Sequence, residues 1–127
     1  MVKHNRPLPA NLIDRLRAVR WLEPWSYGGI DEEPAYGLGF EQELRRELAP
    51  GHVLFGVRDH ARAVAGRMDN DDVLFWLGEE DGRFAVVHLT WSGHAESIPV
   101  SPSSWIFASL DDFAGSMAAE HREWEAD

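Results

Sequence analysis

One stretch in the second half of the chain, FAVVHLTWSGHAE at residues 84–96, holds the side chains best suited to chemistry. Its two histidines, His88 and His94, can act as general bases or bind a metal ion. Thr90 supplies a hydroxyl group and Glu96 a carboxylate that can orient an imidazole. A small histidine-dependent hydrolase needs such groups to converge, so these four residues form one candidate catalytic site.

Their spacing, however, matches no established catalytic or metal-binding motif. The chain contains no HExxH pair, no G-x-S-x-G elbow, no S-x-x-K and no glycine-rich phosphate loop. The acidic run of Asp69, Asp71 and Asp72 lacks the glycine and the distal glutamate of an EF-hand, and it is typical of a tight hairpin turn. We therefore predict no metal site and no cofactor, and we interpret His88 as mainly a hydrogen-bonded structural residue.

The position of these residues on a strand decides what they can contact. Side chains alternate along a strand, so Val87, Leu89 and Trp91 share one face. We expect the final helix of the chain to cover that face, with Trp91 as an anchor at the end of the strand. His88 and Thr90 would then point away from the helix.

Hydrophobic periodicity and turn residues give the remaining elements. Apolar side chains recur at helical spacing in three segments, and a capping box at Ser109 and Asp112 marks the start of the last one. Short apolar runs separated by turns favour strands. The expected helices are 11–21, 40–48 and 109–127; the expected strands are 61–68, 72–77, 83–91 and either 96–100 or 105–108. Residues 22–39, rich in glycine and proline, are expected to be irregular.

These elements predict an α+β fold. We expect an antiparallel sheet of three to four strands within residues 60–107, packed against the N-terminal and C-terminal helices. At 127 residues, with 44% hydrophobic content, the chain has the size of a single globular domain, residues 1–127. It has no cysteine, and its apolar runs are too short for a signal peptide or a membrane span, so we expect a soluble cytoplasmic protein.

The charge is strongly acidic and unevenly spread. The formal net charge is −10, with +4 on residues 1–20 and −14 on residues 21–127. A field of that sign repels phosphate backbones, so it disfavours nucleic acid and suits a basic protein partner. We expect no membrane partner either. The predicted binding surface is the acidic and aromatic part of the irregular segment: Asp31, Glu32, Glu33, Tyr36 and Trp25.

The chain also has six tryptophans, which is many for a domain of this size. Tryptophan is enriched among the side chains that dominate the energy of protein interfaces. Trp21, Trp25 and Trp105 are therefore candidates for surface anchors, and burial of all six in the core is the equally weighted alternative.

Three segments together resemble a family of small bacterial proteins of unknown function. They are DNDDVLFWL, AVVHLTWSG and WIFASLDDF, which are similar to that family's D-D-V-L-F strand, its V-V-H-L-T-W strand and the aromatic and acidic start of its final helix. The resemblance covers residues 40–115 and implies no activity. This chain has His94 where the family pattern leads us to expect lysine or another polar residue, which argues against a family mechanism that needs His94.

Two functional hypotheses follow. The first is a small non-enzymatic binding or regulatory protein, of the inhibitor or immunity type, that presents an acidic face to a basic protein. The alternative is the histidine-dependent hydrolase with its site around His88, Thr90, His94 and Glu96. The oligomeric state is not determined by the sequence.

Overall fold

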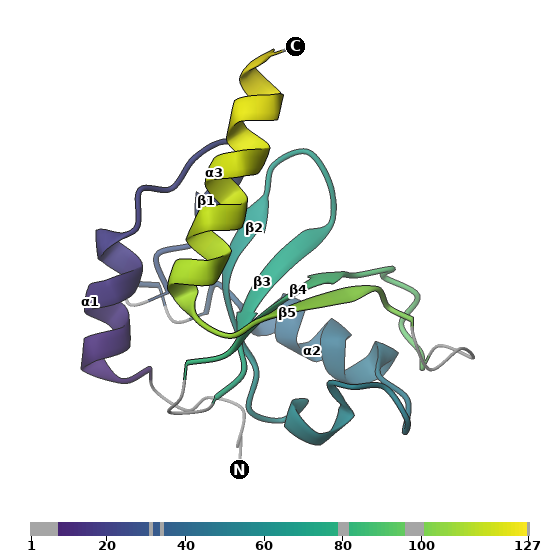
Figure 1. Ribbon diagram of the computed structural model, residues 1–127. Helices are drawn as coiled ribbons and strands as arrows, with labels where there is room; N and C mark the ends of the chain where they lie inside the picture. The colour runs from purple at the N-terminus through teal and green to yellow at the C-terminus, as the bar shows by residue number, and fades with distance from the viewer. Residues whose placement is uncertain (1–7, 31, 34, 79–81, 96–100, 127) are drawn as a thin grey trace.

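The computed structural model describes residues 8–30, 32–33, 35–78, 82–95 and 101–126. Within these ranges the elements are α1 (Ala10–Ala18), β1 (Trp25–Tyr27), α2 (Leu38–Glu47), a 3-10 helix η1 (Phe55–Val57), β2 (Arg62–Arg67), β3 (Asp72–Trp76), β4 (Phe84–His88), β5 (Ser104–Phe107) and α3 (Leu110–Ala126). The strands form one antiparallel sheet whose order follows the chain, from β1 to β5 (Figure 1). The predicted α+β class is confirmed.

The sheet has five strands, whereas the sequence predicted three to four. The additional strand is β1, which lies in the segment expected to be irregular. It pairs Trp25 with Arg67 and Tyr27 with Ala65, along the free side of β2. A strand of three residues is too short to show the alternation by which strands are recognised, and the sequence pattern therefore missed it.

The other edge of the sheet is β5, which pairs with β4 from Phe84↔Phe107 to Val87↔Ser104. Of the two segments that could have supplied this strand, the one containing WIFA does so. The alternative, ESIPV at 96–100, lies outside the described residues. Ser104–Phe107 is largely exposed, as is typical of an edge strand.

Helices cover both faces of the sheet. In Figure 1, α1 and α3 lie on the near side and α2 lies behind it. The buried side chains accordingly form two hydrophobic clusters, one on each face. The first joins α1 and α3 to Leu74, Trp76, Phe84 and Val86. The second joins α2 to Val73, Phe75, Val87 and Leu89.

The face covered by the final helix is therefore the opposite of the predicted one. The alternation along β4 is as expected, but Phe84 and Val86 pack with α3, while Val87 and Leu89 pack with α2. Trp91 contacts Phe40 of α2 at a ring-centroid distance of 6.0 Å, and it remains 48% exposed. Both faces of β4 are apolar, so alternation alone does not determine which helix packs on which face.

The helix ends agree with the sequence only in part. Ser109 Oγ accepts a hydrogen bond from the Asp112 backbone amide at 3.1 Å, which confirms the predicted cap of α3. The first helix was expected to begin at residue 11, but α1 begins one residue earlier and Pro9 occupies the N-cap position. Among the described residues, no helix is both long enough and apolar enough to cross a bilayer.

Candidate functional site

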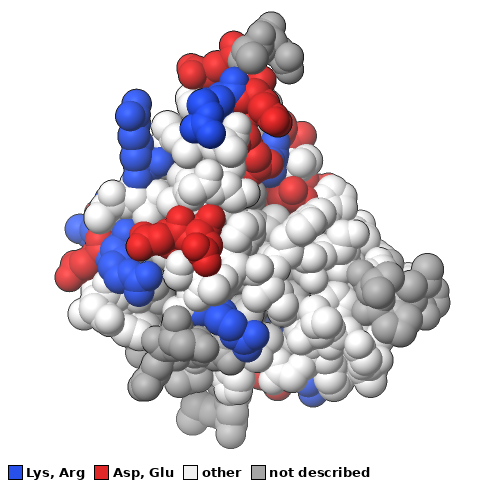
Figure 2. Space-filling model, in the orientation of Figure 1, with Lys and Arg blue, Asp and Glu red and all other residues white. Residues whose placement is uncertain are grey.

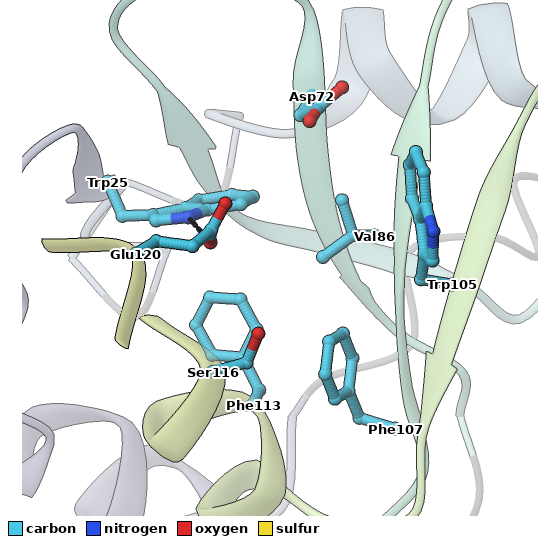
Figure 3. A pocket seen from close by; sticks show the side chains of 8 residues that line it. All are labelled: Trp25, Asp72, Val86, Trp105, Phe107, Phe113, Ser116 and Glu120. Carbon is cyan, nitrogen blue, oxygen red and sulfur yellow. Dashed lines mark hydrogen bonds between the residues drawn. The ribbon is translucent and has the colours of Figure 1, made fainter. Parts of the chain in front are cut away.

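A cavity of about 310 Å³ opens on the near face of the sheet, between α3 and the strands β3, β4 and β5. Figure 3 shows its side chains, which come from five different elements and surround a floor made by Val86. Most of these side chains are aromatic, and two of them carry carboxylates. The lining residues are Trp25, Asp72, Val86, Trp105, Phe107, Phe113, Ser116 and Glu120.

The inner wall of the cavity is a set of fixed aromatic rings. Phe113, which is 1% exposed, meets Trp25 edge-to-face at a centroid distance of 5.1 Å. Phe107 meets the same Phe113 ring edge-to-face at 5.6 Å. Such pairs hold one another in place beyond the energy of their burial. The aromatic wall of the cavity is therefore already fixed, and a ligand that binds there does not have to immobilise these side chains.

The outer wall is Trp105, and it is far more accessible. In β5, Trp105 lies directly opposite Val86 of β4, which places its indole on the cavity side of the sheet. Its neighbour Ile106 points to the other face by strand alternation. Trp105 is 53% exposed, so one face of its ring is available to solvent. Of the three tryptophans predicted as surface anchors, Trp105 is the exposed one, Trp21 is half-buried and Trp25 is only 3% exposed.

Glu120 of α3 joins the aromatic wall to a charged network. Its Oε1 accepts a hydrogen bond from Trp25 Nε1 at 3.4 Å, and its Oε2 accepts one from Arg67 Nη1 at 2.7 Å. Arg67 also donates from Nε and Nη2 to the two oxygens of Asp69, at 2.8 and 2.9 Å. The bonds to Asp69 raise the pKa of Arg67, and Arg67 in turn lowers the pKa of Asp69. Arg67 is therefore a permanent cation held between two carboxylates.

The second carboxylate of the cavity, Asp72, pairs with His88. The two residues face each other in the β3–β4 register, and His88 Nδ1 lies 2.7 Å from Asp72 Oδ1. The side chain of His88 is 47% exposed and that of Asp72 is 15% exposed. The predicted hydrogen-bonded role of His88 thus has a partner. The acidic run forms the β2–β3 hairpin as expected, with Asn70 Oδ1 accepting from the Asp72 amide at 2.8 Å.

The other residues of the predicted catalytic site lie in the turn that follows β4. Thr90 Oγ1 accepts a hydrogen bond from the Ser92 amide, and Ser92 Oγ donates to the carbonyl of His94. His94 Nδ1 lies 3.1 Å from the carbonyl oxygen of Ala95. Glu96 is outside the described residues. The structure thus pairs His88 with Asp72 on β3, while the side chain of His94 bonds within the turn and that of Thr90 bonds both within the turn and to Glu47 of α2.

Two buried glutamates of α2 hold this turn from below, and the sequence analysis did not identify them. Glu47, fully buried, accepts hydrogen bonds from the backbone amides of Thr90 and Trp91, the latter at 2.7 Å. Glu43, which is 2% exposed, accepts one from the Gly93 amide at 2.9 Å. Trp91 has a φ of 59°, which is unusual for a bulky residue and needs such support.

The sequence contained one signal for these glutamates. In FEQELRREL, Glu43 and Glu47 each precede a core leucine, Leu44 or Leu48, and are four residues apart. They therefore lie on one side of the helix, at the margin of its apolar stripe. Hydrophobic periodicity does not predict burial at these two positions, because glutamate is rarely fully buried.

Glu43 and Glu47 also share a hydrogen bond, so the two carboxyl groups titrate as a pair. Burial, and then the bond to Glu43, raise the pKa of Glu47. The bond to Glu47 lowers the pKa of Glu43. Of the two carboxyl groups, Glu47 is therefore the one that holds a proton to higher pH.

The predicted binding surface around residues 31–36 does not form one patch with Trp25. Glu32 and Glu33 are exposed, and Asp31 lies outside the described residues. Tyr36 is half-buried beside Phe40, against the cluster on the α2 face, whereas Trp25 belongs to the cluster on the α3 face. Burial raises the pKa of the Tyr36 hydroxyl. Tyr36 and Trp25 thus pack on opposite faces of the sheet, and Glu32 and Glu33 lie in the chain between Tyr36 and Ile30, which packs in the same cluster as Trp25.

Metal ligands do not gather in the ranges that the structure describes: no group of three or more histidine, aspartate or glutamate side chains there is placed to hold an ion. His52, for example, is a buried structural residue. Its Nδ1 accepts the Leu54 amide at 3.0 Å, so its Nε2 carries the hydrogen and donates to the Pro102 carbonyl at 2.8 Å.

Comparison of the chain with protein-family models, with curated proteins and with solved structures finds no match in any of the three.

Proposed function

We propose that this chain is a small non-enzymatic binding protein whose partner is a basic protein, in the manner of an inhibitor or an immunity protein. The observation that carries the proposal is the cavity between α3 and β5. It combines an accessible indole, Trp105, with the carboxylates of Asp72 and Glu120. Exposed aromatic anchors next to charged groups are typical of protein interfaces.

The charge around the cavity supports a basic partner. Asp69 and Glu120 both bond to the guanidinium of Arg67, and a third carboxylate, that of Asp72, lines the cavity beside His88. These three carboxylates outnumber the one guanidinium, so negative charge is in excess at the cavity. Acidic side chains gather along the C-terminal half of α3, beside a broad uncharged surface over the strands (Figure 2). With a net charge of −10, the whole molecule attracts basic proteins over a distance of about one Debye length.

A display library of random peptides, selected on the immobilised protein, tests the proposal. We expect the selected peptides to be enriched in arginine and lysine, and their association rate to fall as salt is added. Reversing Glu32 and Glu33 to lysine should slow association and weaken its salt dependence, because steering charge is lost. Selected peptides with no excess of basic residues would contradict the proposed function.

A histidine-dependent hydrolase is the second candidate, and the Asp72–His88 pair favours it. A carboxylate bonded to imidazole Nδ1 is the arrangement that orients a catalytic base. If the protein is a binding protein, His88→Gln should leave peptide binding nearly unchanged. A hydrolytic activity that is present in the wild type and lost in His88→Gln, with the fold retained, would support the enzyme instead.

Elemental analysis gives a further prediction about metal. Protein purified without a histidine tag should contain no stoichiometric divalent ion. His52, His88 and His94 each already bond to a protein oxygen, and metal sites need several free ligands that converge. One equivalent of zinc that disappears on replacement of His88 or His94 would contradict this expectation and favour the hydrolase.

A further inference from the structure

The cavity between α3 and β5 has the chemistry of a receptor for one side chain. From its shape and charge we infer that it receives a single arginine side chain of the partner, whose guanidinium stacks on Trp105 and faces Asp72 and Glu120. This inference rests on the proposed function, because it names the group by which a basic protein would be recognised.

The aromatic walls fit a flat cation. Guanidinium is planar, is weakly hydrated and stacks on aromatic faces, whereas the lysine ammonium is a compact and strongly hydrated charge. Trp105 offers an indole face from β5, and Trp25 and Phe113 close the cavity on the α3 side (Figure 3). A cavity of about 310 Å³ has the size of a small-ligand site.

The carboxylates are placed on two sides of this space. In Figure 3, Asp72 lies at one end of the cavity, above Val86, and Glu120 lies beside Trp25. The five N–H donors of a guanidinium point in several directions in one plane, so they can reach separate acceptors, which a single ammonium does less well. The excess negative charge of the cluster is then neutralised by the incoming side chain.

The protein already contains an internal example of the same recognition. Arg67 lies with its guanidinium carbon 5.9 Å from the centroid of the Trp25 ring and bonds to both Asp69 and Glu120. It approaches the aromatic wall from the β2 side, while the accessible face of Trp105 lies on β5. A second guanidinium at Trp105 would repeat this combination of indole and carboxylate on the open side of the cavity.

Three small probes test the inference: the acetylated amides of arginine, of lysine and of citrulline. Citrulline has nearly the shape of arginine but no charge. The indole N–H signals of Trp25 and Trp105 in NMR spectra report occupation of the cavity directly. We expect saturable shifts with the arginine probe, weaker binding of the lysine probe and no saturable shift with citrulline.

The matched variants are Trp105→Ala, Asp72→Asn and Ile106→Ala. Ile106 is the neighbour of Trp105 on the same strand, is similarly exposed and points to the other face, so it serves as the control. Trp105→Ala should weaken the arginine probe about tenfold, and Asp72→Asn should also weaken it, while Ile106→Ala should not. Equal binding of citrulline and arginine, or no saturable shift with arginine, overturns the inference.

The inference and the proposed function fail in different ways. If basic peptides bind Trp105→Ala as well as they bind the wild type, the proposed binding function is supported and the inference of an arginine site in the cavity is contradicted. If the arginine probe binds specifically but the display peptides lack basic residues, the cavity is supported as a site for a small cation and the proposal of a basic protein partner is contradicted.

Discussion

Replacing Phe113 with alanine should lower the free energy of unfolding by about 4 kcal/mol, the cost of a large cavity in a packed aromatic core. Phe113 is 1% exposed, and its ring contacts those of Trp21, Trp25 and Phe107. Alanine would leave all three rings without a common neighbour. Because two of them line the α3 cavity, the loss should also disorder the proposed binding site.

Trp124→Ala is the matched comparison on the same helix. Trp124 follows Phe113 at helical spacing on the final helix, so periodicity alone would bury it too, but it is 43% exposed. Its replacement should therefore cost less than about 1 kcal/mol. Urea titration of both variants measures the two values. Similar losses for the two variants would mean that α3 packs on the sheet along its whole length and would contradict the observed exposure.

The difference between Phe113 and Trp124 illustrates what periodicity can and cannot predict. Spacing of three and four residues identified α3 as a helix and placed both side chains on one stripe. How far that stripe is covered depends on where the sheet ends, which is a tertiary property. The β2–β3 hairpin, the central strands and the helices α1, α2 and α3 could be predicted, because the sequence signal of each lies within one continuous segment.

The candidate site was harder to predict because it joins distant parts of the chain. The hydrogen bond between Trp25 and Glu120 spans 95 residues, and the one between Arg67 and Glu120 spans 53. Trp25 also belongs to the strand that the sequence pattern missed. Composition indicated a surplus of tryptophan and an acidic surface, but only the packing of α3 on the sheet brings Trp105 near two carboxylates.

The shape of the predicted catalytic stretch depends on two buried glutamates, a residue type that hydrophobic patterns do not select for burial. The turn at residues 90–93 owes its shape to Glu43 and Glu47 of α2, more than forty residues away in the chain. A helix pattern ranks glutamate as exposed because burying a carboxylate is costly unless its oxygens are bonded. Here the backbone amides of the turn supply those bonds.

Glu47→Ala should therefore be one of the most damaging single changes, with a loss of about 3 kcal/mol. It leaves the backbone amides of Thr90 and Trp91 without their acceptor, opens a space at a fully buried side chain and removes the support for the positive φ of Trp91. Gln42→Ala, an exposed change on the same helix, is the control and should cost little. A loss below about 1 kcal/mol for Glu47→Ala would indicate that the turn does not depend on this carboxyl group.

Glu47→Gln should be much milder, because glutamine resembles the protonated acid: its amide oxygen can accept the turn amides while its NH₂ group donates to Glu43. The comparison also has a pH signature. The raised pKa of Glu47 means that its contribution to stability is complete below the ordinary glutamate pKa of about 4.3 and is lost as pH rises through the folded-state value. Glutamine does not titrate, so Glu47→Gln should gain stability relative to the wild type as pH rises from acid toward neutral. Urea titrations of both proteins at several pH values measure this difference, and a gap that is constant or that changes in the opposite direction would place the proton elsewhere than on Glu47.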